Sequence, residues 1–175
     1  MIYLLFGEMG VGKNYVGERL AKYLNCPFFD GDTVITADMM RDILGFKILS
    51  PQEIDRYVYE YLIPAIIGQA LQPNDLVAAQ ALYQQHHRDD VIEALSDNAL
   101  LKATGHNLVK PVWIVSPSFI SHGHRLFGRD QGAGWLAYWL ACRPLFQEPP
   151  KETAMILNET DSDLLGQIRR ITGEW

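Results

Sequence analysis

The chain has 175 residues, which is enough for one domain with a sizeable core and little more. Its formal net charge of −6 argues against broad attraction to nucleic acid or to an anionic membrane surface, but it allows a local basic pocket for phosphates. The two cysteines, Cys26 and Cys142, fit neither a disulfide framework nor a metal-ligand cluster. The apolar run at the N-terminus is too short for a signal peptide or a spanning helix, so we expect a cytoplasmic protein.

Apolar runs of strand length alternate with longer periodic segments along the chain. This alternation predicts an α/β fold with a parallel sheet and flanking helices. The first strand is expected at Ile2–Phe6, and the first helix at Lys13–Leu24, where apolar side chains recur on one face. A short second strand at Pro27–Asp30 and a second helix at about residues 35–44 should follow.

The next helix has a clear beginning in the sequence. Ser50 can cap it, Pro51 suits its first turn, and Glu53 completes a capping box. Apolar residues continue in helical register as far as Ile66. We expect Pro64 to kink this helix, because proline lacks the N–H group that a helix interior requires.

The second half of the chain contains further strands and helices and one unusual segment. Residues 116–150 are rich in glycine, arginine and aromatic side chains, with weak periodicity at the start, so we expect a mobile lid at about residues 116–134. The other expected elements are a strand at 75–82, a helix at 86–103, a strand at 112–115, helices at 134–145 and from Asp161 or Ser162 to about 171, and a strand at 153–157. Neither a repeat nor a linker interrupts residues 1–175, which we therefore expect to form one domain.

The strongest motif lies between the first strand and the first helix. Its residues are Gly7, Glu8, Met9, Gly10, Val11, Gly12, Lys13 and Asn14, which fit the phosphate-binding pattern G-x-x-x-x-G-K-S/T except at the last position. Glycines let the backbone wrap around phosphates, and the N–H groups at a helix N-terminus face the anion. Lys13 should reach the β- and γ-phosphates. The whole segment is therefore predicted to bind ATP.

Asn14 is the departure from this pattern, because the Ser or Thr expected there supplies a hydroxyl to Mg²⁺. An amide oxygen can also bind Mg²⁺, but the asparagine side chain is bulkier and differently placed. We therefore predict Asn14 as a metal ligand and keep a second hypothesis open, in which the protein binds nucleotide without transferring phosphate.

Two carboxylates, Asp30 and Asp32, follow the short second strand. They should lie at the carboxyl edge of the sheet, where open α/β folds bind ligands. A phosphoryl acceptor needs a carboxylate that orients its hydroxyl and takes its proton, and Mg²⁺ needs acidic partners. We predict that both aspartates contact the acceptor, that Asp32 is catalytic and that Asp30 helps to hold the metal. The residues of the third strand include no acidic side chain that could do this instead.

Several basic residues could contact phosphate or acceptor. Arg125, Arg129 and Arg143 lie in or after the expected lid, and Arg129 is the best catalytic candidate because glycines surround it. Arg41 and Arg88 follow Asp32 and the third strand, respectively, and are predicted to face the acceptor.

Two adjacent histidines, His86 and His87, could suggest a metal site. Neighbouring residues on a helix point about 100° apart, so the two rings should not converge on one ion. We expect both side chains at the surface.

The residues Gly10–Gly17, followed by Pro27–Asp32, resemble the gluconate kinase family, with shikimate kinases and adenylylsulfate kinases as more distant relatives. The resemblance implies a three-layer P-loop kinase fold, in which helices flank a five-stranded parallel sheet and a lid covers the site. It also implies that ATP and Mg²⁺ are reactants, that Asp32 acts near the acceptor hydroxyl and that Arg129 belongs to the lid.

Around the acceptor the sequence departs from the gluconate kinases. It lacks their His-Pro-Pro run after Asp32 and the lysine expected soon after Leu82. The leading hypothesis is a kinase that phosphorylates a small metabolite, with gluconate or a related sugar acid as the first choice. A shikimate-type or nucleotide-type kinase and a catalytically impaired ATP-binding module are the alternatives. We expect neither nucleic acid nor membrane as a partner, and the aromatic residues of the lid region leave a homodimer open.

Overall fold

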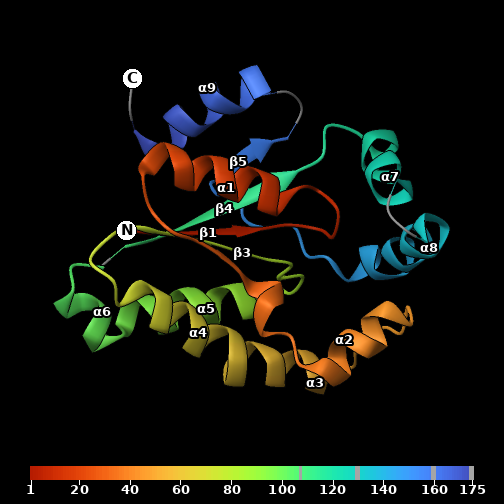
Figure 1. Cartoon of the computed structure of the whole chain (residues 1–175), viewed down its shortest axis with the longest axis horizontal. Helices are drawn as coiled ribbons and strands as arrows, with labels where there is room; N and C mark the ends of the chain where they lie inside the picture. Colours follow the sequence, from red (N-terminus) through yellow and green to blue (C-terminus); the bar gives the residue numbers. More distant parts are fainter. Residues whose placement is uncertain (107, 129–130, 159–160, 174–175) are drawn as a thin grey trace.

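A five-stranded parallel sheet runs through the middle of the protein (Figure 1). The computed structural model describes residues 1–106, 108–128, 131–158 and 161–173, and only the backbone at 161 and 162. The strands lie in the order β2-β3-β1-β4-β5. Their bounds are β1 (Ile2–Phe6), β2 (Phe28–Asp30), β3 (Leu76–Gln80), β4 (Val109–Val115) and β5 (Ala154–Leu157). This sheet confirms the predicted α/β fold class.

Helices cover both faces of the sheet (Figure 1). On one face lie α1 (Lys13–Leu24) and α9 (Asp161–Thr172), and on the other α4 (Ile63–Ala70), α5 (Gln85–Asp97) and α6 (Ala99–Ala103). Four helices lie near the carboxyl ends of the strands: α2 (Ala37–Leu44), α3 (Pro51–Arg56), α7 (Phe119–Phe127) and α8 (Gly132–Cys142). In the described part of the chain, none of the helices has the length and apolar character that crossing a membrane requires.

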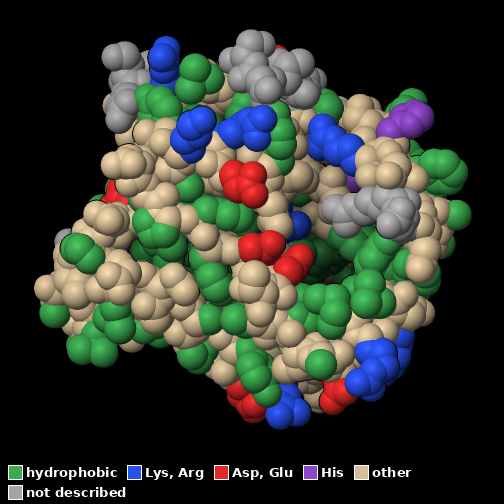
Figure 2. Space-filling model, viewed as in Figure 1, with side chains coloured by type: hydrophobic (Ala, Val, Ile, Leu, Met, Phe, Trp, Pro, Cys, Tyr) green, Lys and Arg blue, Asp and Glu red, His purple; other side chains and the backbone are tan. Residues whose placement is uncertain are grey.

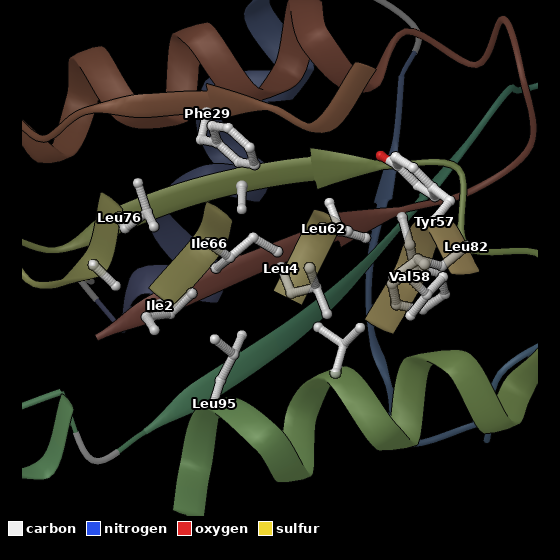
Figure 3. Packing of buried hydrophobic residues seen from close by; sticks show 14 of the residues in the cluster. Ile2, Leu4, Phe29, Tyr57, Val58, Leu62, Ile66, Leu76, Leu82 and Leu95 are labelled. Atoms are coloured by element: carbon white, nitrogen blue, oxygen red, sulfur yellow. The ribbon is translucent and has the colours of Figure 1, made fainter. Parts of the chain in front are cut away.

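The central strand β1 explains why the sheet is covered on both faces. Ile2, Leu4 and Phe6 point to the side of α4 and α5, while Tyr3 and Leu5 point to the side of α1 and α9, and all five are at most 3% exposed. A strand that is buried on both faces has a continuous apolar sequence, as here. Figure 3 shows the first of these layers, where Leu4 lies among Leu62, Val58 and Leu82. Each buried aliphatic side chain contributes about 1.5–3 kcal/mol.

The helix that leads from Ser50 toward the sheet begins as predicted. Ser50 accepts a hydrogen bond from the Glu53 N–H, and the Glu53 carboxylate accepts one from the Ser50 N–H, which confirms the capping box. The helix was predicted to kink at Pro64. In the structure it is interrupted before that residue, because a π-helical segment, η2 (Tyr57–Leu62), separates α3 from α4. Pro64 stands in the first turn of α4, where its missing N–H costs little.

Two boundaries differ from the prediction for local reasons. The helix expected at 86–103 is divided at Asn98, whose extended backbone ends α5 and whose side chain accepts hydrogen bonds from the N–H groups of Leu100 and Leu101 to cap α6. Strand β4 begins earlier than expected and includes Pro111. This proline precedes Val112, where pairing with β5 begins, so it lies outside the β4–β5 ladder.

The segment expected as a mobile lid contains helices in its described part. Helix α7 and the first turn of α8 occupy it, and Ser118 caps α7 by accepting a hydrogen bond from the Ser121 N–H at 3.0 Å. Near β2, the expected helix begins later, at Ala37, because a 3₁₀ turn, η1 (Gly31–Val34), precedes it and Thr36 caps it. Both α2 and α8 contribute residues to the wall of a cavity near the carboxyl ends of the strands.

Candidate active site

The loop between β1 and α1 has the backbone geometry of a phosphate cradle. Gly7, Gly10 and Gly12 have φ angles of 153°, 83° and 91°, which favour glycine. A Cβ atom at Gly7 would come within 2.4 Å of the Ile114 carbonyl oxygen, and one at Gly12 within 2.2 Å of the Asn158 amide nitrogen. The described first turn of α1 has neither a side-chain cap nor an acidic residue. Its N–H groups therefore suit an anion.

The Lys13 ammonium lies over this loop. Its Nζ donates to the carbonyl oxygens of Gly7 and Glu8 at 3.3 and 3.0 Å. The lysine is the first residue of α1, so the helix fixes its backbone while its long side chain returns toward the glycines. This arrangement places a positive charge at the loop that the sequence predicted to bind phosphates.

Residues distant in the sequence support the loop from outside. The Val11 carbonyl accepts hydrogen bonds from Asn158 Nδ2 at 2.8 Å and from Arg125 Nη1 at 2.9 Å. On the same side, His122 Nε2 bonds to the Met9 carbonyl oxygen, and this bond requires Nε2 to donate. Arg125 had been predicted as a lid cation, and its guanidinium here holds the loop backbone. Burial lowers the pKa of His122, which favours the neutral ring.

Helix α8 also contacts the loop. The Trp139 indole N–H donates to the Glu8 carboxylate, and Arg143 lies 3.9 Å from the same carboxylate. Trp139 is fully buried, so its N–H needs such an acceptor. Glu8 fits no fixed position of the phosphate-binding pattern, and the sequence carried no signal of its contact with a tryptophan 131 positions away.

A tyrosine after β3 reaches the loop from the cavity side. The Tyr83 hydroxyl accepts a hydrogen bond from the Met9 N–H at 3.0 Å. Burial raises the pKa of Tyr83, so the phenol stays neutral. Tyr83 stands close to the position where the gluconate kinase resemblance led us to expect a lysine, so this part of the site is neutral.

The two predicted carboxylates border the same cavity as the loop. The Asn14 side-chain amide donates to one oxygen of Asp30, and the other oxygen accepts from the Asp32 N–H at 3.0 Å. Figure 2 shows acidic side chains beside a hollow with largely hydrophobic walls. The cavity has a volume of about 600 Å³, and Lys13, Asn14, Asp30 and Asp32 are among its lining residues.

Two buried polar side chains fix the turn that carries these carboxylates. The Tyr57 hydroxyl donates to the Gly31 carbonyl oxygen at 2.8 Å and accepts a hydrogen bond from the Gln80 side-chain amide. Gln80 ends β3 and is 5% exposed. Burial raises the pKa of Tyr57, which keeps its hydroxyl protonated. Sequence reasoning missed both residues, because neither belongs to a motif.

Arg41 and Arg88, the two described arginines predicted to face the acceptor, do not line this cavity. Arg41 has a side chain that is 75% exposed, pairs with Asp38 at 2.9 Å and does not line the cavity. Arg88 is buried, and its guanidinium donates to the carbonyl oxygens of Leu82, Tyr83 and Gln147. It holds the chain after β3 against the segment before β5. Arg129 lies outside the described residues.

His86 is exposed as expected, whereas His87 is not. His87 is 2% exposed rather than at the surface, and its Nε2 lies 2.7 Å from an Asp55 carboxylate oxygen. Ligand atoms of Asp55, His86 and His87 lie within 4.8 Å of one another, close enough to hold a metal ion. The prediction that the two rings would not converge was therefore wrong, because the side chains turn toward each other and their ring centroids are 4.0 Å apart.

The residues at the predicted ATP and Mg²⁺ site fit those two ligands. Glycines with positive φ keep the loop open for phosphates, and Lys13 supplies the positive charge. Asn14, Asp30 and Asp32 offer the amide and carboxylate oxygens that Mg²⁺ prefers. The bond between Asn14 and Asp30 brings together the two predicted metal ligands.

The chain is similar to one family model and to several solved kinase structures. The family model described as shikimate kinase matches residues 9–46, from the loop to the end of α2. Among solved structures, a gluconokinase from Sinorhizobium meliloti 1021 is similar, with a TM-score of 0.69 and 15% identity over 98% of this chain and 93% of that chain. A sugar kinase from Janibacter sp. HTCC2649 gives a TM-score of 0.72 and 13% identity over 98% and 94% of the two chains.

A third similar structure was solved with a nucleotide. It is Kti12 from Chaetomium thermophilum in complex with ADP-AlF3, with a TM-score of 0.62 and 12% identity over 99% of this chain and 98% of that chain. No curated protein sequence matches the chain. At these identities the structural likeness establishes the fold, which is that of P-loop kinases. The fold, together with the family-model match over residues 9–46, makes the chain similar to P-loop small-molecule kinases.

Proposed function

We propose that this protein is a kinase that transfers the γ-phosphoryl group of ATP to a hydroxyl of a small molecule. One observation carries the proposal: Lys13 of the phosphate loop and the carboxylates of Asp30 and Asp32 line one cavity of about 600 Å³. A phosphoryl donor held by the loop would therefore meet an acceptor beside the carboxylates. Cavities of this size hold small molecules.

The reaction that this arrangement supports is a direct transfer. The acceptor oxygen forms a bond to the γ-phosphorus while the bond from that phosphorus to the bridging oxygen of ADP breaks. Asp32 accepts the proton of the acceptor hydroxyl, and Lys13 neutralises charge on the phosphates. Most of the rate enhancement would come from positioning and charge stabilisation. Arg129 remains our proposed lid cation.

Asn14 and Asp30 would hold Mg²⁺, with Asp32 as a nearby acidic partner. The ion, when bound, supplies charge neutralisation at the β- and γ-phosphate oxygens. An alternative function, nucleotide binding without transfer, is favoured by Asn14 alone. The carboxylates and Tyr57, which fixes their turn through Gly31, favour catalysis, because binding of nucleotide alone would not need them.

The resemblance to a known family indicates which acceptors to test first. The resemblance to gluconate kinases makes gluconate or a related sugar acid the first compound to test, with shikimate and nucleosides next. A cytoplasmic location, a homodimer and a lid at about residues 116–134 also remain predictions from the sequence.

A screen for ADP release tests the proposal. The purified protein is incubated with ATP and Mg²⁺ and with sugar acids, shikimate, nucleosides and uncharged alcohols in turn. We expect at least one compound to raise ADP release above the rate with ATP alone. Measurable ATP binding without stimulation by any compound would support the non-catalytic module instead.

A further inference from the structure

The wall of the cavity that faces the carboxylates is apolar. Helix α2 and the loop after it contribute Met40, Ile43, Leu44, Ile48 and Leu49 to the lining. Leu44 and Ile48 are 55% and 44% exposed, so they are not buried by the protein itself. Apolar side chains that line a cavity favour a ligand that removes their surface from water.

Aromatic rings extend this wall to α8. The Phe46 ring packs edge-on against Trp135, with centroids 5.3 Å apart, and lies against Gly134, where a Cβ atom would come within 2.3 Å of it. Phe46 has a φ angle of 58°, which is unfavourable for a bulky residue and requires support from its surroundings. Trp135 and Tyr138 line the cavity beside it. The apolar lining residues therefore come from α2, from the loop after it and from α8, and Phe46 packs against Trp135.

The part of the cavity wall that the structure describes carries little positive charge. Lys13 is the one lysine or arginine among its described lining residues, and its ammonium belongs to the phosphate loop. The lining also includes His87, whose Nε2 lies 2.7 Å from an Asp55 carboxylate oxygen. Basic residues of the surrounding elements bind protein groups away from the cavity: Arg41 pairs with Asp38, Lys47 with Asp42 and Arg143 approaches Glu8.

An anionic acceptor would be poorly stabilised in this environment. A carboxylate or phosphate that leaves water needs charged hydrogen-bond donors, for which arginine is the usual residue. Here it would lose its hydration next to Asp32, the carboxylate that is not assigned to the metal, and this charge would repel it. A neutral hydroxyl, by contrast, can donate to a carboxylate, and an apolar body can cover the wall.

We propose that the acceptor is an uncharged alcohol or phenol with an apolar, ring-containing body, rather than a sugar acid, shikimate or a nucleotide. This inference rests on the proposed function, because it takes the cavity as the acceptor site. The hydroxyl oxygen gains the phosphoryl group, ADP leaves, and the proton passes to Asp32. The body of the alcohol contacts α2, the loop after it and the aromatic side chains of α8.

Two pairs of probes separate charge from apolar character. 3-Phenylpropane-1,2-diol and 3-phenyllactate share a ring and differ in one carboxylate, whereas glucitol and gluconate share a polar body and differ in the same way. Calorimetry with a non-hydrolysable ATP analogue and Mg²⁺ measures the affinity of each. We expect the phenyl diol to bind about tenfold or more tighter than each of the other probes. A phenyllactate or gluconate affinity equal to or above that of the diol, or absence of diol binding, would overturn the inference.

A charge introduced into the apolar wall provides a second test. Leu44→Arg places a cation in the cavity, and Leu100→Arg is the matched control because Leu100 is exposed on α6, away from the cavity. The first variant should reverse the preference between the phenyl diol and phenyllactate, and the second should retain it. An unchanged preference in a folded Leu44→Arg protein would count against the inference.

These binding measurements also distinguish the inference from the proposed function. Selective binding of the diol with no phosphorylation of any alcohol would contradict the kinase assignment and leave the ligand class supported. Phosphorylation of gluconate without binding of the diol would support the kinase and overturn the ligand class.

Discussion

The phosphate-loop side and the acceptor side of the cavity are built in different ways. On the loop side, hydrogen bonds join Met9 to Tyr83 and join Val11 to Asn158 and Arg125. Three positions of the loop are glycines, which have no side chain. The opposite wall consists of apolar side chains on α2 and the loop after it. Under the proposed function, the loop would select the phosphoryl donor and the apolar wall would select the acceptor.

Removal of the charge on the loop should have the largest effect. Lys13→Met removes the cation beside the predicted phosphates, so turnover should fall by about 10²-fold or more. Lys22→Met is the control, because Lys22 is exposed in the last turn of the same helix. ADP release and circular dichroism measure activity and folding. Normal turnover in the Lys13 variant would contradict the assignment of the loop.

The acceptor side should respond differently. Asp32→Asn removes the proposed proton acceptor, so we expect kcat to fall by about 10²–10⁴-fold while ATP affinity is retained. Asp38→Asn serves as the control, since Asp38 pairs with Arg41 outside the cavity. Titration of ATP by calorimetry separates the two effects, and a parallel loss of ATP affinity would argue against a role confined to the acceptor.

Asn14 ends the phosphate-binding motif and bonds to the carboxylate of Asp30, so it connects the loop side of the cavity to the carboxylates. Asn14→Ser restores the hydroxyl that usually contacts Mg²⁺ but removes the bond to Asp30. We expect the Mg²⁺ concentration for half-maximal activity to fall by about tenfold. A higher requirement for Mg²⁺ in this variant would show that Asn14 is adapted to its bond with Asp30.

Removal of the Tyr57 hydroxyl, which fixes the turn that carries Asp30 and Asp32, should lower the stability of the protein moderately. Tyr57→Phe leaves the buried Gly31 carbonyl and the Gln80 amide without their partner, which should lower the free energy of unfolding by about 1–3 kcal/mol. Tyr59→Phe is the control, because its hydroxyl bonds to Asp90 at the surface. Urea denaturation compares both with the parent protein, and equal stability of the two variants would contradict this role for Tyr57.

The smallest expected effect is on the pH dependence of stability, through His122 of α7, which contacts the phosphate loop. Burial lowers the pKa of His122, so below about pH 6.5 the unfolded chain takes up a proton that the folded chain resists. The stability from the neutral ring is present above that pH and is lost as the pH falls toward the folded value. His122→Asn should weaken this dependence in urea denaturation between pH 7.5 and 5.5, whereas His124→Asn should retain it. Identical pH dependence in both variants would refute the assignment.

The sequence predicted the loop side well because its chemistry depends on fixed residue types at fixed spacing. Glycines with positive φ, the following lysine and the capping box at Ser50 are local features, and each took the expected form. The supporting contacts of Trp139 and Asn158 could not be predicted, because they join positions more than 100 residues apart. Arg41 and Arg88 illustrate the same limit, since spacing along the chain does not tell which way a long side chain points.

The central claim is that the cavity joins a phosphoryl donor to an acceptor hydroxyl. It is tested most directly by incubating the protein with γ-labelled ATP, Mg²⁺ and the acceptors of the screen, and by locating the label. We predict a labelled phosphate ester of one acceptor with the parent protein and none with the Lys13→Met variant. Label that stays in ATP, or appears only as inorganic phosphate with every acceptor, would contradict the claim.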